Sequence, residues 1–181
     1  KYPDYIFGAS QPQHYQFIKD HYPEIYERIK TAIKKGQWEC QGGMWVEADC
    51  NLISGESMLR QILLGKNFFM DEFGVDIDNL WLPDVFGYSA ALPQILQKSG
   101  IKSFLTQKLS WSQFNNFPHH TFKWQGIDGS EVLTHFPPEN TYNSELDTEF
   151  LMPAQTHFKE KQVLDEFISL FGVGDGGGGP K

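Results

Sequence analysis

The chain alternates between short apolar runs and longer stretches whose apolar residues recur every three or four positions. The short runs predict β-strands at residues 5–8, 37–46, 80–82, 101–106 and 167–171. The longer stretches predict helices around residues 14–18 and at 23–35, 54–73, 90–98 and 145–165, the last with a break at Pro153. The Asp-Gly pair between the apolar-rich runs 121–126 and 132–136 predicts a hairpin. Strands that alternate with helices across short turns indicate an α/β fold with parallel strands and flanking helices.

Composition narrows the classes of protein that this can be. Hydrophobic residues make up 40% and aromatic residues 15% of the 181 positions, which is typical of a globular domain with a real core. The net charge of -8 argues against a nucleic acid or an anionic membrane as partner. No apolar run is long enough for a transmembrane helix. Two cysteines form no disulfide framework and suit a reducing compartment.

Polar and aromatic side chains gather where the predicted strands end. These residues are Glu47 and Asp49, Asp84, Lys108, Tyr142 and Asp175. The carboxyl ends of parallel strands meet at one edge of a sheet or barrel, and that edge carries the chemistry in α/β folds. We therefore expect these residues to share one functional rim.

Each of these residues also has a simpler interpretation, and for Asp175 it is a flexible linker formed by the surrounding glycines. An aspartate after a strand is often an N-cap of the next helix, and spacing alone gives Asp84 equal odds of capping and of catalysis. Glu47 and Asp49 could belong to a polar loop. Lys108 could be a solvated loop lysine, or a cation beside Asp84 if their strands are parallel neighbours. Tyr142 could be a packed loop aromatic.

Three segments resemble a known family. Residues 82–89 read Leu-Pro-Asp-Val-Phe-Gly-Tyr-Ser, residues 42–51 read Gly-Gly-Met-Trp-Val-Glu-Ala-Asp-Cys-Asn, and residues 106–111 read Thr-Gln-Lys-Leu-Ser-Trp. These motifs resemble the glycoside hydrolase family 38 α-mannosidases and are closest to their bacterial and cytosolic-type branch. The resemblance runs along nearly the whole chain.

The resemblance implies that residues 1–181 are a single domain, an incomplete N-terminal catalytic (β/α)7 barrel of a longer enzyme. It implies retaining hydrolysis of terminal α-mannosides, with Asp84 as the nucleophile that forms a covalent glycosyl-enzyme intermediate and Asp175 as the general acid/base. The residues expected to contact the sugar are Trp45, Glu47, Asp49, Lys108 and Tyr142. It further implies a cytoplasmic protein that forms a homo-oligomer in its full-length form.

The resemblance also implies one zinc ion, with Asp84 among its ligands. The family's His-x-Asp segment would precede Lys1 and a further histidine would follow Lys181, so Asp84 is the one expected ligand within the chain. A single carboxylate does not hold zinc specifically. We therefore expect the isolated chain to bind zinc weakly or not at all and to be inactive.

Two other functions are consistent with parts of the sequence. A non-catalytic carbohydrate-binding module could use Trp45, Trp81 and Trp111 as platforms for sugar rings. A metal-dependent polysaccharide deacetylase would need a His-x-x-x-His pair, and none of the six histidines has that spacing.

Overall fold

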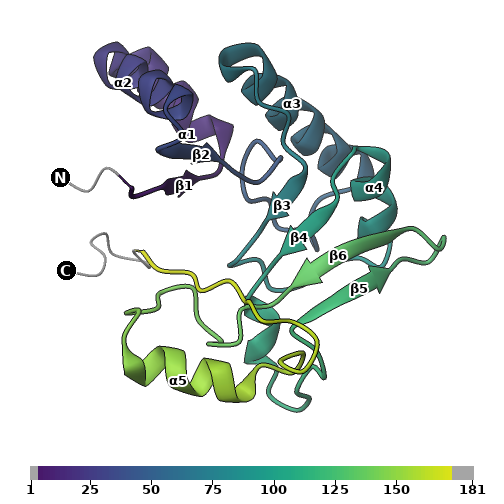
Figure 1. Cartoon of the computed structure of the whole chain (residues 1–181). Helices are drawn as coiled ribbons and strands as arrows, with labels where there is room; N and C mark the ends of the chain where they lie inside the picture. Colours follow the sequence, from purple (N-terminus) through teal and green to yellow (C-terminus); the bar gives the residue numbers. More distant parts are fainter. Residues whose placement is uncertain (1–3, 173–181) are drawn as a thin grey trace.

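The computed structural model describes residues 4–172 and contains most of the alternating elements that the sequence predicts (Figure 1). The strands are β1 (Phe7–Ala9), β2 (Trp38–Cys40), β3 (Asn79–Trp81), β4 (Ser103–Leu105), β5 (Thr121–Gln125) and β6 (Glu131–His135). The α-helices are α1 (Pro12–His21), α2 (Pro23–Lys34), α3 (Gly55–Phe73), α4 (Leu92–Lys98) and α5 (Thr148–His157), and a 3-10 helix, η1, spans Lys108–Trp111.

The strands form two sheets with parallel pairing at their centre. Strands β1 and β2 pair in parallel, and a second sheet has the order β3-β4-β6-β5, in which β3, β4 and β6 are parallel. Strand β5 is antiparallel to β6, so the predicted hairpin is confirmed. The α/β class with parallel strands is confirmed, whereas the described residues do not form a closed (β/α)7 barrel.

Two glycines join the sheets at a close backbone approach. The amide of Gly43 donates to the Asn79 carbonyl at 3.1 Å, and the amide of Gly42 donates to Asn79 Oδ1 at 2.9 Å. Gly42 has a φ of 66°, and a Cβ at this position would lie 2.8 Å from Cβ of Trp81. A side chain would therefore be strained in its backbone and would also clash, which explains glycine here.

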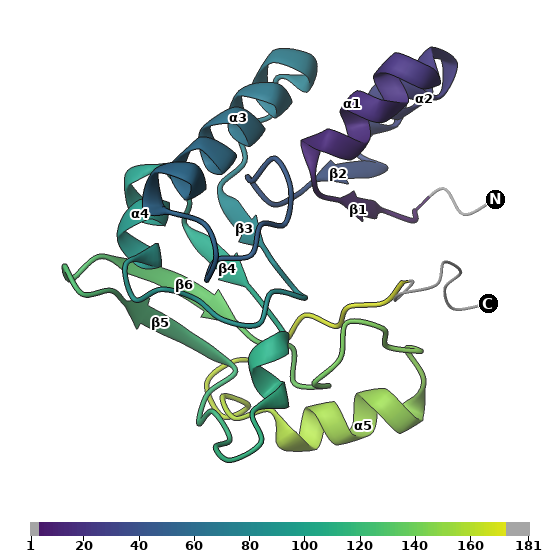
Figure 2. The same cartoon turned by 180° about the vertical axis from the view of Figure 1, so that it is seen from behind.

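Helices α1 to α4 lie on one side of the strands, and α5 lies on the other side (Figures 1 and 2). The main core forms where Leu80, Phe104 and Val132 on the sheet face Ile62 of α3 and Leu96 of α4. A second apolar cluster joins α1, α2 and α3 through residues that include Tyr15, Tyr26 and Phe69. None of the helices within residues 4–172 has the length and apolar character needed to cross a membrane.

The C-terminal part of the described chain differs from the prediction. Helix α5 ends at His157, not at residue 165, because tertiary contacts take over its backbone: the Lys159 amide donates to His120 Nδ1 at 3.1 Å. Residues 167–171 are not a strand. The Ile168 amide donates to His135 Nε2 at 3.2 Å, and the Leu170 carbonyl accepts from Ser144, so a side chain and a loop bind this segment where a strand would need a neighbour.

Candidate active site

Asp84 lies just beyond β3, where the pairing with β4 continues past the regular strands. The Leu82 amide donates to the Leu105 carbonyl at 2.9 Å, and the Gln107 amide donates to the Pro83 carbonyl at 3.2 Å. These bonds bring the residues that follow the two strands side by side. Helix α4 begins much later in the chain, with Ala91 as its N-cap. Asp84 therefore does not cap the helix that follows it.

Lys108 forms an ion pair with Asp84, as parallel neighbouring strands would require. Its Nζ lies 2.7 Å from Asp84 Oδ1. The lysine side chain is 11% exposed and the aspartate side chain 48%, so the cation is the buried partner. Oδ1 itself is shielded from solvent, and the rest of the carboxylate is open to a ligand. Lys108 therefore lies beside Asp84, and its ammonium balances the charge on Asp84.

Aromatic side chains surround the Lys108 ammonium. Nζ donates to the Tyr142 hydroxyl at 3.3 Å and lies 3.6 Å from the centre of the Trp111 ring. Burial lowers the pKa of Lys108, but the hydrogen bonds and charges of Asp84 and Tyr142 outweigh that effect and raise it. The lysine is therefore a fixed cation at neutral pH, and Tyr142 stands at the same site as Asp84.

A second carboxyl group, Glu47, interacts electrostatically with Asp84. The pKa of Glu47 is raised to about 7, chiefly by burial and also by the negative charge of Asp84, while a hydrogen bond from Ser10 opposes the rise. The Ser10 hydroxyl donates to Glu47 Oε1 at 3.2 Å. Near neutral pH the carboxyl group of Glu47 is therefore partly protonated.

Trp45 and Asp49 take part in other contacts. The Trp45 indole donates to Gln13 Oε1 at 2.9 Å, and its ring packs edge-on against Phe68 at 5.6 Å. Asp49 Oδ1 accepts from the Asn51 amide at 2.8 Å, which closes a turn before α3. Among the described residues, neither side chain forms a hydrogen bond or an ion pair with Asp84.

The sequence analysis missed the residues that hold the loop after Asp84. The Tyr88 hydroxyl shares a hydrogen bond of 2.6 Å with Thr106 and donates toward the Val85 and Leu82 carbonyls at 2.6 and 3.1 Å. Tyr88 thereby fixes the loop that begins at Asp84. Two features of the sequence could have indicated this bond: the tyrosine hydroxyl within the motif at residues 82–89 and the threonine at the end of the predicted strand 101–106.

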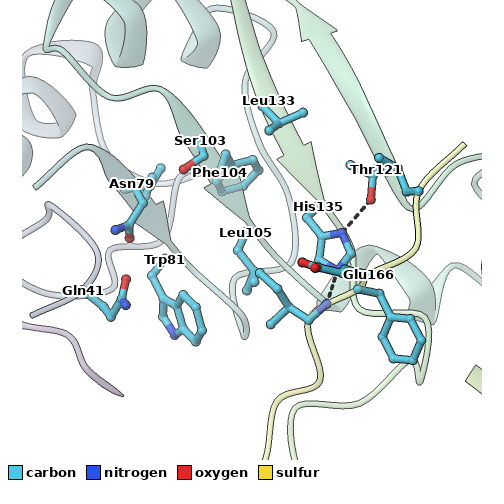
Figure 3. A pocket seen from close by; sticks show the side chains of 14 residues that line it. Gln41, Asn79, Trp81, Ser103, Phe104, Leu105, Thr121, Leu133, His135 and Glu166 are labelled. Carbon is cyan, nitrogen blue, oxygen red and sulfur yellow. Dashed lines mark hydrogen bonds between the residues drawn. The ribbon is translucent and has the colours of Figure 1, made fainter. Parts of the chain in front are cut away.

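A hollow of about 500 Å³ lies on the sheet face opposite α3 and α4, but it is not this site. Figure 3 shows Trp81, Leu105 and His135 directed into it from β3, β4 and β6, with His135 bonded to Thr121 and to the segment that contains Glu166. These three residues are the last of their strands, and the other walls include Asn79 and Ser103 earlier in β3 and β4, whereas Asp84 is absent from the walls. The hollow therefore lies along the strands and ends where the rim begins.

Metal ligands are sparse in the part of the chain that the structure describes. Residues 4–172 contain no group of three or more His, Cys, Asp or Glu side chains placed to hold a metal ion. Asp84 is already paired with a lysine, and no histidine is bonded to it. Zinc usually takes four ligands in proteins, so the described residues do not fit a zinc ion by themselves.

Asp175, the predicted general acid/base, lies outside the described residues. The distance between its carboxyl group and that of Asp84 therefore stays a prediction.

Comparison with known proteins assigns the chain to a family. The model of the glycosyl hydrolases family 38 N-terminal domain matches residues 1–181, and the chain belongs to this family. Alpha-mannosidase G of Dictyostelium discoideum is 53% identical over 179 residues, which are 99% of this chain and 16% of that protein. Alpha-mannosidase 2C1 of Homo sapiens is 51% identical over 178 residues, which are 98% of this chain and 17% of that protein. The chain thus spans about one sixth of the length of these relatives.

A solved structure confirms the fold independently. A glycosyl hydrolase family 38 protein from Enterococcus faecalis matches with a TM-score of 0.65 and 21% identity, over 94% of this chain and 19% of that one.

Proposed function

We propose that this chain is part of the catalytic domain of a retaining α-mannosidase that acts on terminal α-mannosides. The observation that carries the proposal is the Lys108–Asp84 ion pair at the strand ends. The negative charge of Asp84 also raises the pKa of a second carboxyl group, that of Glu47. Membership in the family and the names of the relatives support the substrate class. The pattern of strands and helices supports a place within a larger (β/α)7 barrel.

In this proposal Asp84 is the nucleophile. One of its oxygens bonds to the anomeric carbon as the bond to the leaving-group oxygen breaks, and Asp175 gives that oxygen a proton. Water then attacks the same carbon and gives a proton to Asp175 as the bond between that carbon and Asp84 breaks, so that mannose is released with its original configuration and both carboxyl groups return to their starting states. A retaining reaction requires the two carboxyl groups to lie about 5–5.5 Å apart.

The remaining rim residues would recognise the sugar. Tyr142 and Glu47 can donate to or accept from sugar hydroxyls, because each has a polar group at the rim. Lys108 is bonded to Asp84 and Tyr142, so we assign it the task of holding the nucleophile in place. The proposal also includes Trp45 and Asp49 as sugar contacts. Both side chains would then contact the sugar in addition to their present partners, Gln13 and Asn51.

We extend the proposal to one zinc ion in the full-length protein, with Asp84 as one ligand and the others from outside residues 1–181. A divalent ion would supply positive charge near the sugar hydroxyls. The buried free thiols of Cys40 and Cys50 support a cytoplasmic location. The α-mannoside is the expected partner, and a homo-oligomer is the expected assembly.

The test uses the full-length protein that contains this chain and p-nitrophenyl α-mannoside. Asp84→Asn should lower kcat by roughly ten-thousand-fold or more, as removal of a nucleophile does. Asp165→Asn, which changes an exposed aspartate of the same charge, should leave kcat unchanged. NMR should detect α-mannose as the first product. Full activity in the Asp84 variant, or β-mannose as first product, would refute the mechanism.

A further inference from the structure

The beginning of the chain folds back onto the segment that carries Glu47. Residues 10–13 form four hydrogen bonds with residues 45–47. Two join Gln13 to Trp45, from the Gln13 amide to the Trp45 carbonyl at 3.2 Å and from the Trp45 indole to Gln13 Oε1 at 2.9 Å. The other two hold Glu47, from the Ser10 hydroxyl to Oε1 at 3.2 Å and from the Glu47 amide to Gln11 Oε1 at 3.3 Å.

Gln11 has an unusual backbone for its residue type. Its φ is 64° and its ψ is 88°, in the left-handed region that favours glycine and, among other residues, asparagine. It is the N-cap of α1, but its side chain forms no capping hydrogen bond. A residue in this conformation costs free energy that the surroundings must offset. The Gln11 side chain does not cap the helix. If glycine stood at this position, the contact that would be lost is the hydrogen bond to Glu47.

The contacts leave one oxygen of Glu47 available. Gln11 fixes the backbone amide of Glu47, and Ser10 fixes Oε1. Among residues 4–172, Oε2 has no hydrogen-bond partner, and it is not sealed from solvent. The carboxyl group is therefore held from one side and presents its other oxygen to a ligand.

We propose that Gln11 is a positioning residue, which acts through Glu47 to orient the Oε2 atom toward a hydroxyl group of the bound sugar. The identity of the ligand rests on the proposed function, whereas the link between Gln11 and Glu47 does not. The strained backbone at residue 11 is maintained because it brings Oε1 of the glutamine to the Glu47 amide.

The first experiment tests the link in the chain itself. Gln11→Asn keeps an amide and suits the left-handed conformation better, but its side chain is one methylene shorter. Amide hydrogen exchange at Glu47, followed by NMR, should become about five- to tenfold faster, as expected for the loss of one hydrogen bond. Leu146→Asn is the matched control, because Leu146 has a φ of 57° and its amide donates to Ser144 Oγ, in a loop far along the chain from Glu47. It should leave exchange at Glu47 unchanged.

The second experiment tests the role in the reaction with the full-length enzyme. Gln11→Asn should raise KM for p-nitrophenyl α-mannoside about fivefold and leave kcat within twofold, because a sugar hydroxyl is bound in the ground state and the transition state alike. In a Glu47→Gln background the same change should add less than twofold. Leu146→Asn should change neither parameter.

The outcomes separate this inference from the proposed function. Unchanged exchange at Glu47 in the Gln11 variant would overturn the link, and faster exchange with an unchanged KM would overturn the positioning role. A wild-type enzyme that does not hydrolyse the mannoside would refute the proposed function, and the exchange result would still decide whether Gln11 holds Glu47.

Discussion

Two partly buried groups should give this chain opposing responses to pH. Burial lowers the pKa of His135 to about 4, helped by the nearby charge of His120 and opposed by Glu160. Burial raises the pKa of Glu47 to about 7. Each pKa unit of difference between the folded and unfolded states corresponds to about 1.4 kcal/mol. The full contribution of either group is therefore about 3 kcal/mol.

The two contributions have opposite signs. The unfolded chain binds a proton at His135 near pH 6.5, earlier than the folded chain does, so the stability that neutral His135 provides is lost as the pH falls from 6.5 to 4. The folded chain binds a proton at Glu47 near pH 7, earlier than the unfolded chain does near 4.5. Stability from Glu47 is therefore complete below pH 4.5 and lost as the pH rises through 7. Between pH 7.5 and 5.0, each group changes the free energy of unfolding by about 2 kcal/mol.

The assay is urea unfolding at a series of pH values for three proteins. His135→Gln keeps an acceptor for the Ile168 amide, and Glu47→Gln keeps an acceptor for Ser10. Relative to wild type, His135→Gln should become about 2 kcal/mol more stable as the pH falls from 7.5 to 5.0. Glu47→Gln should become about 2 kcal/mol less stable over the same range.

The comparison with wild type removes the other titrating groups. His120 also has a lowered pKa, caused by burial and opposed by Glu160, but it is present in all three proteins. If the difference between either variant and wild type stays constant from pH 7.5 to 5.0, the environment assigned to that group is wrong.

Three further predictions test the rim and the junction between the sheets. Lys108→Met leaves Asp84 Oδ1 buried without its counter-charge and should cost about 1–3 kcal/mol in urea unfolding, whereas Lys108→Arg should recover most of that loss. Gly42→Ala should destabilise the chain by about 2–4 kcal/mol, and Gly129→Ala by about 1 kcal/mol. Both glycines have a positive φ, but only at residue 42 would the added Cβ also clash with Trp81. Equal losses would contradict this close approach. Equilibrium dialysis with zinc should load much less than one ion per molecule of this chain and about one per molecule of the full-length protein; stoichiometric, tight binding by the chain would show that its own residues suffice.

The sequence predicted those parts of the fold that depend on local patterns. Strands followed by helices and the hairpin at Asp128-Gly129 were visible in residue types and spacing. The end of α5 was not, because it depends on the bond between Lys159 and His120, which lie far apart in the chain. The prediction of a strand at 167–171 was wrong for a similar reason: the segment is bonded to the side chain of His135, which is distant in sequence, and not to a neighbouring strand.

The same distinction between local patterns and contacts of distant residues applies to the candidate site. Asp84 and Lys108 could be paired from sequence because each follows directly on one of two parallel neighbouring strands, so regular pairing alone brings them together. The contact between Glu47 and Gln11 could not be predicted from sequence, because both residues lie in irregular segments. The polar sequence Ser10-Gln11-Pro12-Gln13 at the end of the first strand was visible, but a Ser-Gln-Pro-Gln turn carries no signal for a left-handed backbone at Gln11.

This division indicates which part of the rim is most sensitive to change. Regular strand pairing places Asp84. The Leu82–Leu105 and Gln107–Pro83 hydrogen bonds fix the backbone next to it, and Lys108 balances its charge. Glu47 lies outside any strand, so side chains of a distant segment must supply both its geometry and its environment. Substitutions at residues 10–13 should therefore alter the rim more than their distance in sequence from Asp84 suggests, while substitutions on the outer faces of the helices should not.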